Sequence, residues 1–307
     1  MRVHAVVVNW NGGEENLLCL RALLAAGLAP EEIVFVDNAS ADGSREAVAA
    51  EFPGVVRFDN ASNEGYGHGV NKGVERALAD GAEAVILINN DLELPRATLE
   101  GLIARLEADP RLGIVGPRVV YRDQPERIWA AGGMLTYRQN LSTLLGHRQP
   151  DGPAWQVERA VDYVPGCAML VRRAVFEEVG LLDGAYFAYH EDVDYCLRVS
   201  QAGWGVWLAG ELCATHAAHT STGGGYNPRR KYMMGVNTIW FLRAHGTPAR
   251  WLRFLLFDVA TLPLLLCVES VRGRAKGVLA KAIGTWHGLR GRRVTAELLQ
   301  PGAGPLW

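Results

Sequence analysis

Residues 84–91, with the sequence AVILINND, place an apolar run directly before two amides and a carboxylate. The apolar part, residues 84–88, is typical of a parallel strand that is buried on both faces. Similar runs occur earlier in the chain, at residues 3–8, 33–37 and 55–59. Helical patterns alternate with these runs, at residues 14–26, 44–51, 68–79 and 95–108. The alternation predicts an α/β fold with a mostly parallel central sheet and helices on both faces.

The pattern becomes less regular beyond these elements. Glycine and proline pairs interrupt the apolar runs between residues 114 and 175, which indicates irregular strands and a long loop. A further helix is expected at residues 191–202 and a strand at residues 204–208, before the Gly-rich residues 220–226. We therefore predict a main α/β domain over residues 1–225 and a C-terminal helical region over residues 226–307.

The C-terminal region is strongly basic. It holds 13 of the 31 Lys and Arg residues but 3 of the 33 Asp and Glu residues. Basic segments rich in Trp and Leu favour anionic membranes, and the main domain has no basic stripe that would suit a nucleic acid. The most apolar run, residues 254–268, contains Asp258 and Pro263 and is shorter than the ~20 residues of a spanning helix. We expect a basic amphipathic tail that lies on the inner face of the cell membrane.

Composition also indicates the compartment. The five cysteines are scattered and lack zinc-like spacing, which favours reduced thiols in a cytoplasmic protein. The apolar run at residues 3–8 leads directly into polar residues and follows no basic leader, so we expect no secretory signal. With 49% hydrophobic residues the chain can bury a large core. Composition leaves the oligomeric state open and permits a dimer.

Polar side chains follow the predicted strands at the edge of the sheet where ligands usually bind. Asp37 ends the second strand, where its carboxylate can accept from a base N–H or a ribose hydroxyl. Glycines near residue 65 can bring the backbone close to a ligand, with Asn71 facing a nucleotide sugar. The candidate nucleotide-sugar-binding residues are Asn9, Asn11, Asp37, Asn38, Asn63, Gly65, Tyr66, Asn71, Asn89 and Asn90. Simple turns, with Asp42 as a helix N-cap, are the alternative explanation.

Asp91 is the candidate metal ligand. A diphosphate leaving group needs a divalent cation, and Mg²⁺ or Mn²⁺ binds carboxylate and phosphate oxygens together. His216 is a second candidate ligand, because an imidazole can complete the shell of Mn²⁺, and it is expected in a loop with His219. Alternatively, Asp91 caps the following helix and the histidines are only packed or solvated.

Residues 191–194, EDVD, open a predicted helix whose dipole favours ionised carboxylates. Asp192 is the candidate base that takes a proton from an incoming hydroxyl, and Glu191 is expected to orient the acceptor. Asp194 is expected to cap the helix or to face solvent. An acidic helix start with a purely structural purpose is the competing interpretation.

Taken together in this order, seven segments resemble the family 2 glycosyltransferases, especially the rhamnosyltransferase-like members. They lie within residues 3–240 and read VVVNWNG, VDNASADGS, NEGYGHGVNKG, LINND, VPGCAMLVRR, EDVDYCLR and THAAHTS. The resemblance implies a Rossmann-like GT-A fold and inversion at the anomeric carbon. It also implies that Asp37 binds the base or ribose, Asp91 the metal, Asp192 the acceptor hydroxyl, and His216 the metal or diphosphate.

The chain departs from the family pattern at several positions. Asn89 stands first in the usual DxD triplet, and Leu92 follows it where Thr is common. His219 falls where many relatives have glycine, so its role stays open. The QxxRW signature of processive synthases is absent, which disfavours repeated chain extension.

The sequence therefore favours an inverting, metal-dependent glycosyltransferase of cell-surface glycan synthesis. It would move one sugar from dTDP-L-rhamnose, or otherwise a UDP-sugar, to a lipid-linked or polysaccharide acceptor. A sugar nucleotidyltransferase is an alternative, although its N-terminal Gly-rich phosphate loop with a basic residue is missing. A non-catalytic nucleotide-sugar-binding scaffold is a second alternative, which the joint presence of Asp37, Asp91 and Asp192 disfavours.

Overall fold

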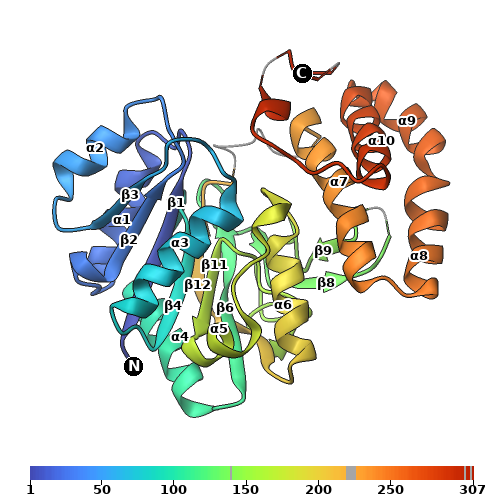
Figure 1. The fold of residues 1–307 in the computed structure, drawn as a ribbon. Coiled ribbons are helices and arrows are strands. Elements are labelled where there is room, and N and C mark those ends of the chain that lie inside the picture. The colour runs from blue at the N-terminus through green and yellow to red at the C-terminus, as the bar shows by residue number, and fades with distance from the viewer. Residues whose placement is uncertain (139, 219–225, 301, 305) are drawn as a thin grey trace.

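The first hundred residues fold as the sequence predicts. The computed structural model describes residues 1–138, 140–218, 226–300, 302–304 and 306–307. Strands and helices alternate along the chain (Figure 1) as β1 (Val3–Asn9), α1 (Glu15–Ala25), β2 (Ile33–Asp37), α2 (Ser44–Glu51), β3 (Val56–Asp59), α3 (Tyr66–Ala79), β4 (Ala84–Asn89) and α4 (Arg96–Ala108). Every boundary lies within two residues of its predicted position. The predicted α/β class is confirmed.

One sheet runs through the main domain in the order β10-β12-β6-β11-β4-β1-β2-β3. Its later strands are β6 (Leu112–Tyr121), β10 (Glu158–Ala160), β11 (Ala168–Arg172) and β12 (Gly205–His216). The pairs among β1 to β4 are parallel, as is the pair of β6 and β12. β11 is antiparallel to both of its neighbours, β4 and β6. It therefore joins the parallel strands β1 to β4 to the parallel pair of β6 and β12, while β10 at the edge is antiparallel to β12.

β6 is longer than the short runs that the sequence suggested and is buried at all of its positions, but its pairing with β12 and β7 contains register shifts, as the expectation of irregular strands implies. Gly116 and Pro117, which indicated a break, are both accommodated inside the sheet. A Cβ at Gly116 would lie 2.2 Å from Val164 Cγ1, so only glycine fits there. Pro117 pairs with Ala209, where the register of β12 shifts before Cys213. Such a bulge tolerates a residue that has no N–H to donate.

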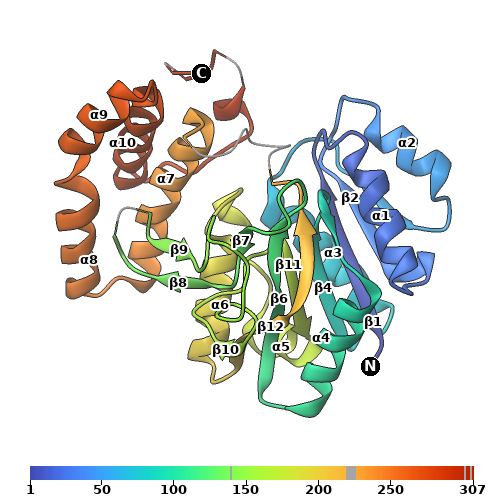
Figure 2. The same cartoon turned by 180° about the vertical axis from the view of Figure 1, so that it is seen from behind.

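Shorter elements complete the main domain. They are β5 (Leu92–Glu93), β7 (Ile128–Ala130), β8 (Gly133–Leu135), β9 (Ser142–Leu144), α5 (Arg173–Val179) and α6 (Glu191–Gln201). β8 and β9 form a separate two-stranded sheet beside the C-terminal helices (Figure 2). The stretch between β6 and β11 thus has the irregular character that its sequence predicts.

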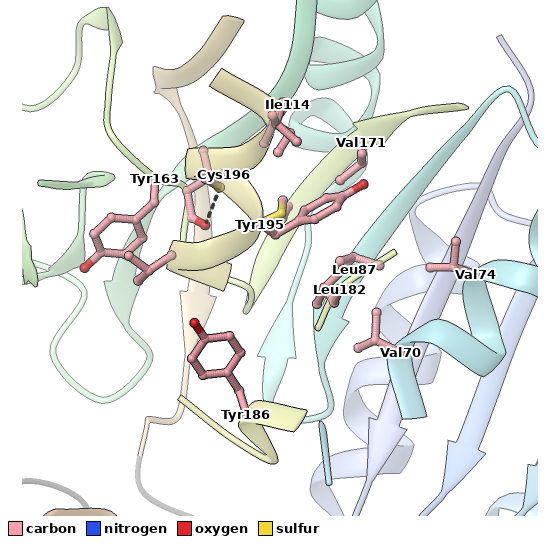
Figure 3. Close-up of a cluster of buried hydrophobic side chains, with 14 of the residues drawn as sticks. Val70, Val74, Leu87, Ile114, Tyr163, Val171, Leu182, Tyr186, Tyr195 and Cys196 are labelled. Carbon is pink, nitrogen blue, oxygen red and sulfur yellow. Dashed lines mark hydrogen bonds between the residues drawn. The ribbon is translucent and has the colours of Figure 1, made fainter. Parts of the chain in front are cut away.

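Each face of the central sheet has its own core. Val6 and Val8 of β1 pack on one face, while Ala5 and Val7 pack on the other. Figure 3 shows part of the first core, in which α3, α6 and the sheet meet around Val70, Leu87 and Tyr195. Burial on both faces explains why the strand sequences are continuous apolar runs and do not alternate.

The predicted C-terminal helical region is present beside the main domain (Figure 1). It comprises α7 (Pro228–His245), α8 (Pro248–Phe254), a π-helical turn (Leu255–Val259), α9 (Leu262–Val271) and α10 (Ala275–Leu289). Its first helix, α7, is a core helix with eleven buried residues. α10 approaches it closely, because a Cβ at Gly235 would lie 2.3 Å from the Lys281 carbonyl oxygen. The exposed apolar surface of the region therefore lies on the later helices.

Residues 248–271 form one helical stretch that contains 18 residues with a mean hydropathy of 2.0, and by length and composition it could cross a membrane. The stretch is longer than the apolar run that the sequence suggested, since Pro263 is accommodated in the first turn of α9. Its two acids turn inward. Asp258 lies 2.6 Å from Lys281 Nζ of α10, and Glu269 lies 2.8 Å from Arg272. Apolar side chains cover the outer side, at Leu252, Leu255, Leu256, Phe257, Leu264, Val268 and Val271.

Candidate active site

A buried hydrogen-bond network joins the ends of β1, β2 and β4. Its centre is the carboxamide of Asn9, which donates to Asp37 Oδ1 at 2.8 Å and to Ser44 Oγ at 2.9 Å. Asn9 Oδ1 accepts from Asn90 Nδ2 at 3.1 Å, and Asn90 also donates to Asn16. Asn9 is fully buried. Asn9 and Asn90, predicted to contact a ligand, therefore hold the strand ends together.

Asp37 is fixed by this network. Its Oδ1 accepts from Asn9 and its Oδ2 accepts from the Ser40 backbone N–H at 2.9 Å. Each carboxylate oxygen keeps a second lone pair, but Asp37 is fully buried, as Asn9 is. Asn11 is exposed nearby, with its Oδ1 accepting from the Ala41 N–H at 2.8 Å.

The Gly-rich segment contacts a distant loop. Asn38 Nδ2 donates to the Gly65 carbonyl at 3.0 Å, and Asn63 Oδ1 accepts from the Gly65 N–H at 2.9 Å. Gly65 has a φ of 93°, and a Cβ there would lie 2.6 Å from the Phe187 carbonyl oxygen. Gly65 was expected to let the backbone approach a ligand closely. In the structure, the group that it approaches closely is the backbone of Phe187.

Tyr66 and Asn71 lie on the same helix, α3, and both contact the second half of the domain. The Tyr66 hydroxyl donates to the Gly166 carbonyl at 2.9 Å, and burial raises the pKa of Tyr66. Asn71 donates to the Leu182 carbonyl at 2.8 Å and accepts from the Leu182 N–H at 3.1 Å. Both ends of the Asn71 carboxamide therefore bind the Leu182 backbone, while its expected contact with a nucleotide sugar stays a prediction.

Strand pairing brings Asp91 and His216 together from opposite ends of the domain. β5 pairs with the end of β12, so that Leu92 lies opposite His216. His216 Nε2 is 2.8 Å from Asp91 Oδ1, and both side chains are buried. The expected loop position of His216 is wrong, since the residue ends β12 in register with Tyr121 of β6. His219 lies outside the described residues.

This pair fits a divalent cation. His216 Nε2 and Asp91 Oδ1 are hydrogen-bonded to each other at 2.8 Å, which places an imidazole and a carboxylate where both could reach one octahedral ion with ligands at about 2.1 Å. His216 Nδ1 is buried and has no hydrogen-bond partner among the described residues. No cluster of three or more His, Cys, Asp or Glu side chains that could hold a metal exists in the described ranges. Mg²⁺ commonly binds through one or two protein groups plus phosphate and water, which matches this site. Asn89 lies half-buried beside it.

The acid pair begins α6. Asp192 accepts from the Gly166 N–H at 3.0 Å and from the Val193 N–H at 2.8 Å, whereas Glu191 Oε2 is buried without a hydrogen-bond partner in the described chain. Burial and then the neighbouring Asp192 raise the pKa of Glu191 to about 8. Burial also raises the pKa of Asp192, although backbone N–H groups oppose that rise. The surroundings therefore favour protonation of Glu191 over Asp192.

Residues 166 and 167 connect the two centres. Gly166 donates its N–H to Asp192 and accepts from Tyr66, while the Cys167 carbonyl accepts from the Asn89 N–H at 3.0 Å. These residues lie in the segment VPGC, and neither was among the candidate site residues predicted from the sequence. Their signal was the family resemblance of that segment, since a glycine and a cysteine carry no distinctive side-chain chemistry here.

Asp194 differs from its prediction. It neither caps the helix nor faces solvent, because it is buried and accepts from His245 Nε2 at 2.7 Å and Arg198 Nε at 2.8 Å. Burial alone would raise the pKa of Asp194, but the hydrogen bond from His245 and the Arg198 charge lower it. The residue links α6 to the end of α7.

Comparison with known proteins adds a family and relatives. The glycosyl transferase family 2 pattern matches residues 5–180. The chain is 30% identical over 237 residues to an N-acetylglucosaminyl-diphospho-decaprenol L-rhamnosyltransferase of Mycobacterium tuberculosis, covering 70% of this chain and 76% of the relative. It is 22% identical to the dTDP-rhamnosyl transferase RfbF of Shigella flexneri, covering 88% and 84% of the two chains.

A solved structure has the same fold. The mannosyltransferase PcManGT from Pyrobaculum calidifontis, in complex with GDP-Man and Mn²⁺, aligns with a TM-score of 0.55 at 16% identity. The alignment covers 95% of this chain and 88% of that one. The GT-A fold that the resemblance implied is thereby confirmed.

Proposed function

Because the chain belongs to glycosyl transferase family 2, we propose that it moves one sugar from a nucleoside-diphosphate donor to a lipid-linked acceptor. The observation that supports this most is the pair of centres, Asp91 with His216 and Glu191 with Asp192, joined through residues 166–167. Rhamnose is the first candidate sugar and dTDP-L-rhamnose the first candidate donor, since two relatives are rhamnosyltransferases. A UDP-sugar is the second candidate donor.

In the proposed reaction the acceptor oxygen attacks the anomeric carbon of the donor. Asp192 takes the proton of the acceptor hydroxyl as the new bond forms, and the bond to the diphosphate breaks with its electron pair. A single displacement of this kind inverts the anomeric configuration. Glu191, protonated near neutral pH, can donate a hydrogen bond that orients the acceptor.

The leaving diphosphate needs positive charge. Asp91 and His216 would hold a Mg²⁺ or Mn²⁺ ion, which when bound stabilises the developing charge on the diphosphate oxygens. Asp37 would accept from the base or ribose, with Asn9 and Ser40 holding its carboxylate in place. Asn11, Asn38, Asn63, Gly65, Tyr66, Asn89 and Asn90 shape the same half of the site.

A lipid-linked acceptor requires access to a membrane. The outer side of residues 248–271 is apolar, while Asp258 and Glu269 on its inner side are paired within the protein. Exposed basic residues lie within this stretch at Arg253, directly after it at Arg272, Arg274 and Lys276, and at the end of α10 at Arg290. We propose that this helix lies sideways on the cytoplasmic face of the membrane, because a spanning helix would expose the paired acids to lipid.

A donor screen tests the function. The protein is incubated with dTDP-L-rhamnose, UDP-, GDP- and CMP-sugars, with Mn²⁺ or EDTA and a polyprenyl-diphosphate-linked sugar acceptor. Metal-dependent release of one nucleoside diphosphate, with sugar on the acceptor, supports the transferase. Donor binding without release would favour the scaffold, and pyrophosphate release from a nucleoside triphosphate and a sugar phosphate would favour the nucleotidyltransferase.

A further inference from the structure

The turn before the acid pair has an unusual backbone. Phe187, Tyr189 and His190 have φ angles of 63°, 70° and 76°. Left-handed φ values are uncommon for residues with a Cβ and persist only where the surroundings impose them. Since this turn leads directly into α6, its conformation sets where Glu191 and Asp192 point.

Asn237 of α7 holds this turn. Its Nδ2 lies 2.8 Å from the carbonyl oxygens of Tyr186, Ala188 and Tyr189. Asn237 is fully buried, and within the described residues its Oδ1 has no hydrogen-bond partner. Three converging carbonyls require a donor, so the amide nitrogen must face them and an oxygen in its place would be repelled.

Two more contacts hold the same turn, one to α7 and one to α3. His190 Nε2 is 3.2 Å from Thr238 Oγ1, the neighbour of Asn237 on α7. On the nucleotide side, the Tyr66 N–H donates to the Phe187 carbonyl at 2.5 Å, next to Gly65. The turn therefore lies between the proposed donor site and α7, and Asn237 is the side chain that gathers its carbonyls.

We propose that Asn237 is a positioning residue for sugar transfer. By holding three carbonyls of residues 186–189 it presents Glu191 and Asp192 to the acceptor hydroxyl, although it touches no substrate itself. The inference rests on the proposed function, because it assigns those two carboxyls their part in transfer. It also makes α7 part of the catalytic unit.

Two substitutions test the proposal. Asn237→Asp keeps the shape but places an oxygen against the carbonyls, and Asn237→Ala removes the group without adding charge. Tyr232→Phe is the matched control, since it removes another buried polar group of α7, whose hydroxyl is 2.9 Å from His287 Nδ1 of α10. For each folded variant, kcat, the donor KM and the pH profile of kcat are measured below its thermal midpoint.

Both Asn237 variants are expected to lower kcat by about 10- to 100-fold, because small misplacements of catalytic groups have effects of that size. The donor KM should stay within about twofold, the pH profile should shift, and Tyr232→Phe should keep its kcat. An unchanged kcat in Asn237→Ala, or equal losses in Tyr232→Phe, would overturn the proposal. A wild-type protein that transfers no sugar would instead reject the proposed function. In that case the pKa of Glu191, measured by NMR titration, still tests the positioning role. The same Glu191 pKa in Asn237→Ala and in the wild type would overturn it.

Discussion

The two acids at the start of α6 have different surroundings although they are adjacent in the chain. Asp192 accepts two backbone N–H groups, while Glu191 Oε2 is buried and finds no donor in the described part of the chain. Donors stabilise the charged form of a carboxyl and burial destabilises it. At residue scale, this difference supports the proposal that Asp192 acts as the base while Glu191 stays neutral.

Replacement of Asp192 by Asn should abolish transfer and spare donor binding. The change removes the basic oxygen and keeps the shape, so kcat is expected to fall by about 100- to 10,000-fold. Single-turnover transfer measures the first effect, and the donor-induced thermal shift measures the second. Turnover close to that of the wild type would reject Asp192 as the base.

The raised pKa of Glu191 has a consequence for stability. Between an unfolded pKa near 4.5 and a folded pKa of about 8, the native state binds more protons than the unfolded state. Stability contributed through this group therefore falls as pH rises through that range. Glu191→Gln, which cannot ionise, should unfold at a higher temperature than the wild type at pH 8 but not at pH 4. Scanning calorimetry at both pH values checks this, and equal differences at the two would contradict it.

At the scale of elements, strand pairing assembles the candidate metal site. Asp91 and His216 are 125 residues apart and meet because β5 pairs with the last residues of β12. Local sequence gives no indication of that pairing, since β5 has only two residues. The polar ends of β1, β2 and β4 were easier to predict, because parallel strands end at one edge of a sheet.

Close packing of α7 and α10 depends on glycine. Gly235→Ala would place a Cβ 2.3 Å from the Lys281 carbonyl oxygen, so the helices must separate. Overpacking of this kind costs about 1–3 kcal/mol, which should lower the thermal midpoint measurably. Gly152→Ala is the control, because nothing lies within 4 Å of its added Cβ and its midpoint should hardly change. Equal midpoints for the two variants would show that α10 is not held tightly against α7.

For the molecule as a whole, the proposed membrane contact depends on where the exposed apolar face of the C-terminal helices lies. α8 and α9 lie at the outer edge in both views (Figure 1 and Figure 2), with α7 between them and the main domain. Deleting everything after residue 245 would uncover the α7 surface on which α10 packs, so it would change more than the membrane contact. Substitutions on the outer face avoid that difficulty.

The double substitution Leu256→Glu with Leu264→Glu should release the protein from anionic vesicles. These side chains are 53% and 69% exposed, so the fold should tolerate the change. Burial of each leucine in lipid contributes about 1.5–3 kcal/mol, and vesicle affinity should fall by at least about tenfold. Met134→Glu, at a 45% exposed residue of the main domain, is the control in the same flotation assay. Retained binding by the double variant would refute the proposed face.

The sequence by itself determined the alternation of strands and helices in the first hundred residues, the helix at Glu191–Gln201 and the polar strand ends. These features follow from periodicity and turn chemistry, which act over a few residues. Only the tertiary structure decided that Asn9 binds the Asp37 carboxylate, that Asn71 binds the Leu182 backbone, that Asp194 is paired with His245, and that Asn237 holds the turn before the acids. Each of those assignments depends on partners between 28 and 111 residues away, and whether a polar group faces a ligand, solvent or another strand is fixed only when the chain has packed.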